Sequence, residues 1–318
     1  MKKILAIILA MLMLVTMGAC DSGKNDAEYV IGICQIAEHP ALDAATKGFK
    51  DAVMKALGEG NVKFDTQIAA GDPNICSNIM LDFVNSEVDM ILANATDCLQ
   101  AAATATKDIP ILGTSITEYG VALGLKDFDK IVGGNISGTS DLAPLDQQAA
   151  MIKEWFPDAK NIGLLYCSAE ANSKYQVDVV MAELTKLGFT CKEYAFSSTS
   201  DMAAVTQSAA DNSDVIYVPT DNTVAESTGI IDGICRPAGV PVIAGEKGIC
   251  QGCGVATLSI DYYDLGYATG EMAVKILTGD ADISTMPIQY SPVFTKLYNA
   301  EICNELKLNI PEGYAPIE

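Results

Sequence analysis

Histidine and basic residues are scarce in this chain of 318 residues. The single histidine is His39, and 20 lysines and arginines stand against 41 aspartates and glutamates, which gives a formal net charge of −21. With one histidine, most catalytic triads and histidine-based metal sites lack their parts. The acidic balance makes nucleic acids and anionic surfaces poor partners.

Familiar enzyme motifs are missing as well. The sequence has no glycine-rich phosphate-binding loop, no Gly-x-Gly-x-x-Gly after its first expected strand, no Gly-x-Ser-x-Gly elbow and no His-Glu-x-x-His. We therefore expect a protein that is not an enzyme and that carries no cofactor and no metal ion.

The N-terminus has the pattern of an export signal. Lys2 and Lys3 precede an apolar run over residues 4–15, which is shorter than the roughly 20 residues of a membrane span. The sequence Thr-Met-Gly-Ala-Cys then ends at Cys20 and is similar to a bacterial lipobox. We expect a signal peptide over residues 1–19, lipid attachment at Cys20, a polar tether over residues 20–27 and an extracytoplasmic location. An ordinary secretory cleavage site is the alternative.

Ten cysteines leave an odd number once Cys20 is acylated. Cys250 and Cys253 form the only tight pair, and a zinc site would need a second pair or histidines. Several of the others lie in apolar stretches, where cysteine behaves as a small hydrophobic residue. We expect buried thiols, and the sequence leaves open whether any form disulfides.

Apolar runs with β-branched residues alternate with helical periodicity along the rest of the chain, 49% of which is hydrophobic. This alternation predicts βαβ units, and the pattern restarts near residue 161, which indicates two Rossmann-like α/β lobes with parallel sheets. Strands are expected at residues 28–35, 62–69, 88–95, 109–114, 130–136, 161–167, 189–196, 215–218, 240–244 and 254–260. Helices are expected at residues 41–57, 97–106, 170–187, 201–212, 222–238 and 261–277, with another that starts after Asp72.

Polar residues follow the expected strands where a ligand would lie between two lobes, beyond the carboxyl ends of the strands. Asp221 would pair with a ligand ammonium, and Asn172 and Ser173, near a helix N-terminus, would bind a carboxylate. For each of these residues, helix capping is the alternative role. The full set of expected ligand-binding residues is Gln35, His39, Thr96, Thr117, Asn172, Ser173, Asp221, Asn222 and Asp261.

A set of motifs in one order resembles the tryptophan/tyrosine-type substrate-binding proteins of bacterial ABC importers. The resemblance covers nearly the whole mature chain. It rests on Ile31-Gly-Ile-x-Gln35, His39-Pro-Ala-Leu-Asp-Ala44, Gly134-Asn-Ile-Ser-Gly138, Glu170-Ala-Asn-Ser173, Tyr217-Val-Pro-Thr-Asp-Asn222 and Asp261-Tyr-Tyr-x-Leu-Gly266. The chain departs from the family pattern at Thr96-Asp-Cys-Leu-Gln100 and Thr117-Glu-Tyr119, two loops of the expected cleft.

The resemblance implies a type I periplasmic-binding-protein fold with a three-segment hinge. The N-terminal lobe would comprise residues 28–137 and 262–290, and the C-terminal lobe residues 138–261 and 291–318. The protein would act as a monomer, bind an aromatic amino acid between the lobes and deliver it to an ABC permease and its ATPase. A sensing receptor on the same fold, or import of another small solute, are the alternatives.

Overall fold

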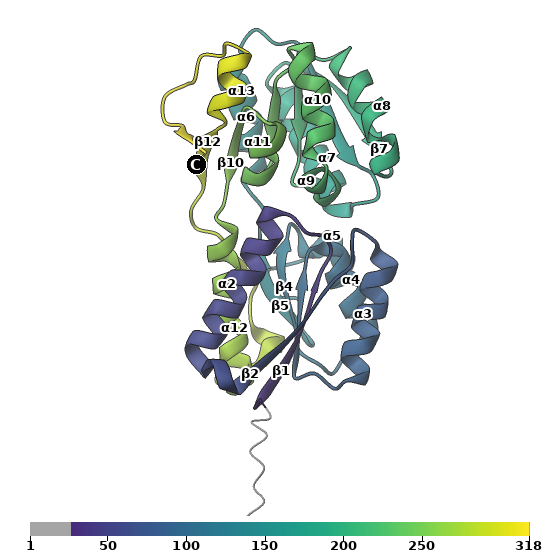
Figure 1. The fold of residues 1–318 in the computed structure, drawn as a ribbon, viewed down its shortest axis with the longest axis vertical. Helices are drawn as coiled ribbons and strands as arrows, with labels where there is room; N and C mark the ends of the chain where they lie inside the picture. The colour runs from purple at the N-terminus through teal and green to yellow at the C-terminus, as the bar shows by residue number, and fades with distance from the viewer. Residues whose placement is uncertain (1–26, 318) are drawn as a thin grey trace, which may run out of the picture.

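The computed structural model describes residues 27–317, so the expected signal peptide (1–19), Cys20 and nearly all of the tether lie outside the described residues. Figure 1 shows two lobes stacked along the long axis of the molecule. None of the helices between residues 27 and 317 combines the length and the apolar character needed to cross a membrane.

The first lobe is built on a six-stranded sheet in which every neighbouring pair is parallel. Its central strands are buried on both faces, as near-continuous apolar runs predict. Helices α2 (Pro40–Leu57) and α12 (Tyr262–Leu277) cover one face, and α3 (Pro73–Asn85) and α4 (Thr96–Ala105) cover the other (Figure 1). The strand order is β11 (Gln289–Tyr290), β5 (Ile136–Ser140), β4 (Ile111–Ile116), β3 (Met90–Asn94), β1 (Tyr29–Gln35), β2 (Val62–Ile68).

The second lobe has a seven-stranded sheet, parallel except for the pair β10–β12. Helices α6 (Leu145–Trp155) and α7 (Ala171–Lys186) pack on one face, and α8 (Thr199–Ala210), α10 (Thr228–Ala238) and α11 (Lys247–Cys253) pack on the other. The strand order is β13 (Ala315–Pro316), β12 (Thr295–Tyr298), β10 (Ala256–Ser259), β9 (Val242–Ala244), β8 (Val215–Val218), β6 (Asn161–Cys167), β7 (Thr190–Phe196).

The two sheets share one topology. The order β2-β1-β3-β4-β5 of the first is repeated as β7-β6-β8-β9-β10 in the second. The predicted internal repeat and the two Rossmann-like lobes are therefore confirmed. In each sheet the order changes direction between the first and third strand of the repeat, and ligands of open α/β sheets bind at such switch points.

The chain passes between the sheets three times: between β5 and α6, between β10 and α12, and between β11 and β12. Strand β5 continues to Ser140, three residues past the predicted lobe boundary at residue 137. The return through α12 is tied to α2 by close helix packing. A Cβ on Gly266 would lie 1.9 Å from the backbone oxygen of Ala45, and one on Gly48 would lie 2.1 Å from that of Tyr263. Only glycine permits this approach of the two backbones.

Two predicted elements are wrong. The strand expected at residues 130–136 begins only at Ile136, because Gly133 and Gly134 both have positive φ and form a turn. The second wrong prediction is the single helix over residues 222–238, because the structure has two helices, α9 (Asn222–Glu226) and α10, separated at Ser227. Several elements were not expected: α6, α11, α5 (Tyr119–Leu123), η1 (Glu59–Asn61), η2 (Ile283–Thr285) and the C-terminal strands β11, β12 and β13. The C-terminal helix α13 (Ala300–Glu305), which was not expected either, lies between β12 and β13.

Candidate functional site between the two switch points

The switch points of the two lobes face each other. The segments that follow β1 and β3 meet those that follow β6 and β8 around a cavity of about 200 Å³. Because parallel strands end at one edge of each sheet, residues far apart in sequence converge here. The cavity is lined from the first lobe by Ile36, Ala37, Ala70, Gly71, Pro73 and Asp97, and from the second by Cys167, Ala169, Glu170, Ser197, Ser198, Thr199, Asn222, Thr223 and Glu226.

One hydrogen bond joins the lobes beside this cavity. His39, at the start of α2, places Nε2 3.2 Å from Oδ1 of Asn222, at the start of α9. The Asn222 amide is oriented by its Nδ2, which donates to Glu170, so Oδ1 accepts from the imidazole. Burial lowers the pKa of His39, which is therefore neutral near pH 7 and protonated at Nε2. Its Nδ1 is a buried acceptor without a hydrogen-bond partner among the described residues.

The residue that organises the second lobe's wall is Glu170, which was not among the predicted ligand residues. Its Oε2 accepts from the backbone N of Asn222 (3.0 Å), from Asn222 Nδ2 (2.8 Å) and from Asn172 Nδ2 (3.2 Å). Its Oε1 accepts from the backbone N (2.8 Å) and Oγ1 (2.7 Å) of Thr223. This carboxylate fixes the β6–α7 loop to the start of α9. The signal in the sequence was an acid in a strand-end loop, inside the motif Glu170-Ala-Asn-Ser173.

Asp221, Asn172 and Ser173 lie together in the second lobe, as their loops predicted, and all three are buried. The two carboxylate oxygens of Asp221 accept from the backbone N of Cys167 (2.7 Å) and of Val224 (2.9 Å), so Asp221 caps α9. Capping was the alternative that the sequence left open. Burial and the nearby Glu170 raise the pKa of Asp221. The expected contact of Asp221 with a ligand ammonium stays a prediction.

In the first lobe, Gln35 supports the loop after β1. Its Nε2 donates to Ala37 O (2.7 Å) and Asp43 Oδ1 (2.7 Å), and its Oε1 accepts from Thr46 Oγ1 (2.6 Å). The side-chain amide is thus engaged within the lobe, and its expected ligand contact stays a prediction.

Two further predicted ligand residues of the first lobe, Thr96 and Thr117, are buried just after the ends of β3 and β4. Thr96 opens α4 after β3, and Thr117 follows β4 and accepts at its backbone O from Ser140 Oγ (2.9 Å). Beside them the backbone adopts positive φ at non-glycine residues, 97° at Ala95 and 56° at Ser115. Such conformations cost on the order of 1–3 kcal/mol each and cluster at binding sites. Ser115 Oγ is also buried without a partner among the described residues.

Asp97 gives the cavity its electrostatic character. Burial, together with the nearby Glu170, raises the pKa of Asp97 to about 7. The residues that line this cavity include no lysine or arginine to balance these carboxyl groups. A ligand that brings a positive charge would supply the missing partner of Asp97.

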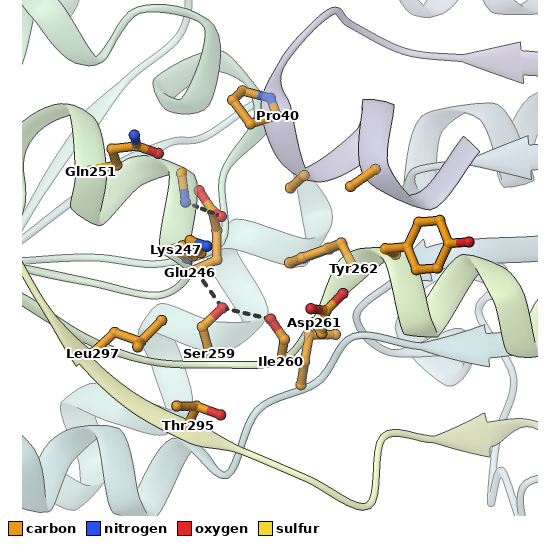
Figure 2. A pocket seen from close by; sticks show the side chains of 14 residues that line it. Pro40, Glu246, Lys247, Gln251, Ser259, Ile260, Asp261, Tyr262, Thr295 and Leu297 are labelled. Atoms are coloured by element: carbon orange, nitrogen blue, oxygen red, sulfur yellow. Dashed lines mark hydrogen bonds between the residues drawn. The ribbon is translucent and has the colours of Figure 1, made fainter. Parts of the chain in front are cut away.

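A second cavity, of about 460 Å³, opens on the side of the hinge segments (Figure 2). Here Lys247 N donates to Ser259 Oγ (3.1 Å), which donates to Ile260 O (3.1 Å), and burial raises the pKa of Glu246 to about 7. Asp261 lines this cavity, is exposed, and caps α12 by accepting from Asp264 N (3.1 Å). Of the nine predicted site residues, Asn222 lines the cavity between the switch points, and Asp261 lines this second cavity instead. The other seven are not among the residues that line either cavity.

The sequence matches the family described as ABC transporter substrate binding protein over residues 30–315. A tyrosine-binding protein of Clostridioides difficile (strain R20291) is 36% identical over 302 residues, 90% of this chain and 87% of that protein.

Solved structures show the same fold. The L-Trp complex of an ABC domain from Streptococcus pneumoniae is 32% identical, covers 92% of this chain and 100% of its own, and superposes with a TM-score of 0.87. The ligand-free, open structure of a substrate-binding protein with adhesive properties from Clostridium difficile is 38% identical, covers 91% of this chain and 99% of its own, and gives 0.70. The chain thus resembles the tryptophan complex more than the open structure, although its sequence is nearer to the latter. This agrees with lobes that are in contact through His39 and Asn222.

Proposed function

The chain belongs to the ABC transporter substrate-binding protein family, and from this premise we propose that it binds a free aromatic amino acid between its lobes. Proteins of this family act outside the cytoplasm and hand a small ligand to a membrane permease driven by an ATPase. The tyrosine-binding relative and the L-Trp complex, each at least 32% identical, support an aromatic side chain.

The observation that carries the proposal is the acidic cavity between the switch points. Asp97 there has no basic neighbour in the lining, so an α-ammonium group gives it a charge-assisted partner as the lobes exclude water. The volume of about 200 Å³ is below the roughly 300–1,000 Å³ typical of sites for drug-sized ligands, which favours a ligand the size of one amino acid.

The remaining assignments complete the proposal. The proposed ligand contacts are those of Gln35, His39, Thr96, Thr117, Asn172, Ser173, Asp221 and Asn222. Asp261, which lines the second cavity, would reach the ligand from the hinge side. The protein acts as a monomer whose lobes divide near residues 137, 261 and 290. It is held at the membrane by lipid on Cys20, since a two-chain anchor gives stable attachment.

A thermal-shift screen over the twenty amino acids tests the ligand class, with mass spectrometry of any solute that co-purifies. We expect tryptophan, tyrosine or phenylalanine to raise the melting temperature most. A larger shift from leucine or lysine, or no shift from any amino acid, would refute the proposed ligand.

A further inference from the structure

Three cysteines converge inside the first lobe, just below the cavity. Cys98 Sγ lies 3.2 Å from Cys76 Sγ and 3.5 Å from Cys34 Sγ, and all three sulfur atoms lie within 4.8 Å of one another. Each of these residues has no exposed surface. They form a triangle and not a pair, although they come from three elements that are distant in sequence.

Two of the three elements bring a helix N-terminus to the thiols. Cys76 lies in the first turn of α3 and Cys98 in the first turn of α4, and Cys34 is the penultimate residue of β1. The free N–H groups and the dipole at a helix N-terminus favour an anion, so two helices direct positive potential towards the sulfur atoms. A buried thiolate cluster still needs a cation, and within residues 27–317 no lysine or arginine is hydrogen-bonded to these thiols.

We propose that Cys34, Cys76 and Cys98 bind one thiophilic metal ion, Cu(I) or an ion of similar softness. Thiolate sulfur selects such ions, and binding would release the thiol protons to solvent. With metal–sulfur bonds of about 2.3 Å, a planar three-sulfur site has sulfur atoms about 4.0 Å apart. Two of the observed sulfur–sulfur distances, 3.2 and 3.5 Å, are within about 1 Å of this value.

Three cysteine ligands, with no other ligand type, indicate which kind of ion the site would bind. Among the described residues, no histidine or carboxylate lies close enough to complete the set as a fourth ligand. Structural zinc sites take four protein ligands in a tetrahedron, so three thiolates suit an ion that accepts trigonal coordination. A disulfide is the competing use of these thiols. It needs a sulfur separation of about 2.05 Å and leaves the third thiol without a role.

Titration of the full mature chain with Cu(I) tests this site. The protein is fully reduced under nitrogen, and Cu(I) is supplied in competition with a chelator of known affinity. Native mass spectrometry gives the stoichiometry. We expect one Cu(I) per chain, and affinity at least about tenfold lower in Cys76→Ser and Cys98→Ser. Cys303→Ser is the matched control, because Cys303 is equally buried but lies in the second lobe, with Sγ 3.4 Å from Val255 O.

A second set of variants guards against misfolding. Cys76→Ala and Cys98→Ala avoid a buried hydroxyl, and circular dichroism reports whether each variant folds. Failure of the wild type to compete for Cu(I), or equal binding by the folded alanine variants, would overturn the proposal. So would a Cys76–Cys98 disulfide recovered from protein handled without added oxidant.

Discussion

His39 Nε2 and Asn222 Oδ1 lie 3.2 Å apart and come from opposite lobes, so one hydrogen bond spans the cleft. The His39 side chain does not cap its own helix α2. Its imidazole instead donates to Asn222 across the cleft. The bond exists only when the lobes are together. It therefore contributes to closure, and closure is what a ligand of this fold stabilises.

Removing the imidazole is expected to weaken ligand binding. A typical hydrogen bond is worth about 0.5–1.5 kcal/mol, so His39→Ala should raise Kd by roughly 2- to 10-fold. His39→Gln keeps an N–H donor and should recover part of the loss. Calorimetry with the best ligand measures both, with Asn212→Ala as the control, since Asn212 is exposed and its side chain bonds within its own helix region. An unchanged Kd in folded His39→Ala would contradict the role in closure.

Asp97 makes stability depend on pH in a defined direction. The folded pKa, about 7, lies above the ordinary value of 3.8, so the folded chain holds a proton that the unfolded chain releases. Stability from this group is present at low pH and is lost as pH rises from about 4 through 7. Asp97→Asn should therefore raise the unfolding free energy at pH 8 by on the order of 1–2 kcal/mol, with a smaller change at pH 5. Melting curves of this variant beside Asp108→Asn, an exposed acid, check the sign.

The same carboxyl group makes ligand affinity depend on pH in the opposite sense. An ammonium group favours the ionised form of Asp97, so affinity should rise as pH increases through about 7 and level off above it. Asp97→Asn should bind more weakly at pH 8 and lose this dependence. A wild-type affinity that stays flat between pH 5.5 and 8.5 would remove Asp97 from the ligand's ammonium.

Close packing of α2 on α12 should not tolerate a methyl group. In Gly266→Ala the new Cβ would meet backbone atoms of Ala45, which cannot rotate away, and overpacking of this kind costs about 1–3 kcal/mol or more. Gly233→Ala is the matched control, because no atom lies within 4 Å of its Cβ position and alanine favours a helix. Urea unfolding compares them. Equal stability of the two variants would show that the helices can separate.

The lipid anchor is tested separately, since Cys20 lies outside the described residues. Cys20→Ala should move the protein from the detergent phase to the aqueous phase, because the acyl chains supply the membrane affinity. A variant that still partitions with detergent would support another mode of attachment.

Sequence patterns predicted the scaffold better than the site. The strand Val215–Val218 appears with the expected bounds, since four buried apolar residues before a proline leave little freedom. Strand-end loops gave the right neighbourhood for Asn172 and Asp221, but a carboxylate that caps a helix and one that faces a ligand look alike in sequence. Glu170 was missed because its partners are backbone N–H groups 52 and 53 residues away.

The cluster of Cys34, Cys76 and Cys98 could not be predicted from the sequence either, because its members are also far apart along the chain. Cys98 lies 64 residues from Cys34 and 22 residues from Cys76, so spacing gave no sign of a cluster. The closely spaced pair Cys250 and Cys253 was the stronger signal in the sequence, and the structure has both thiols buried and free. All nine cysteines of the described residues are free and eight are buried, which confirms the expectation of buried thiols.

Isothermal titration of the mature chain with L-tyrosine, L-tryptophan and L-leucine tests the central claim most directly. The account predicts saturable one-to-one binding of at least one aromatic amino acid and much weaker binding of leucine. Tight binding of leucine with none of the aromatic pair, or no binding of any of the three by folded protein freed of co-purified solute, would contradict it.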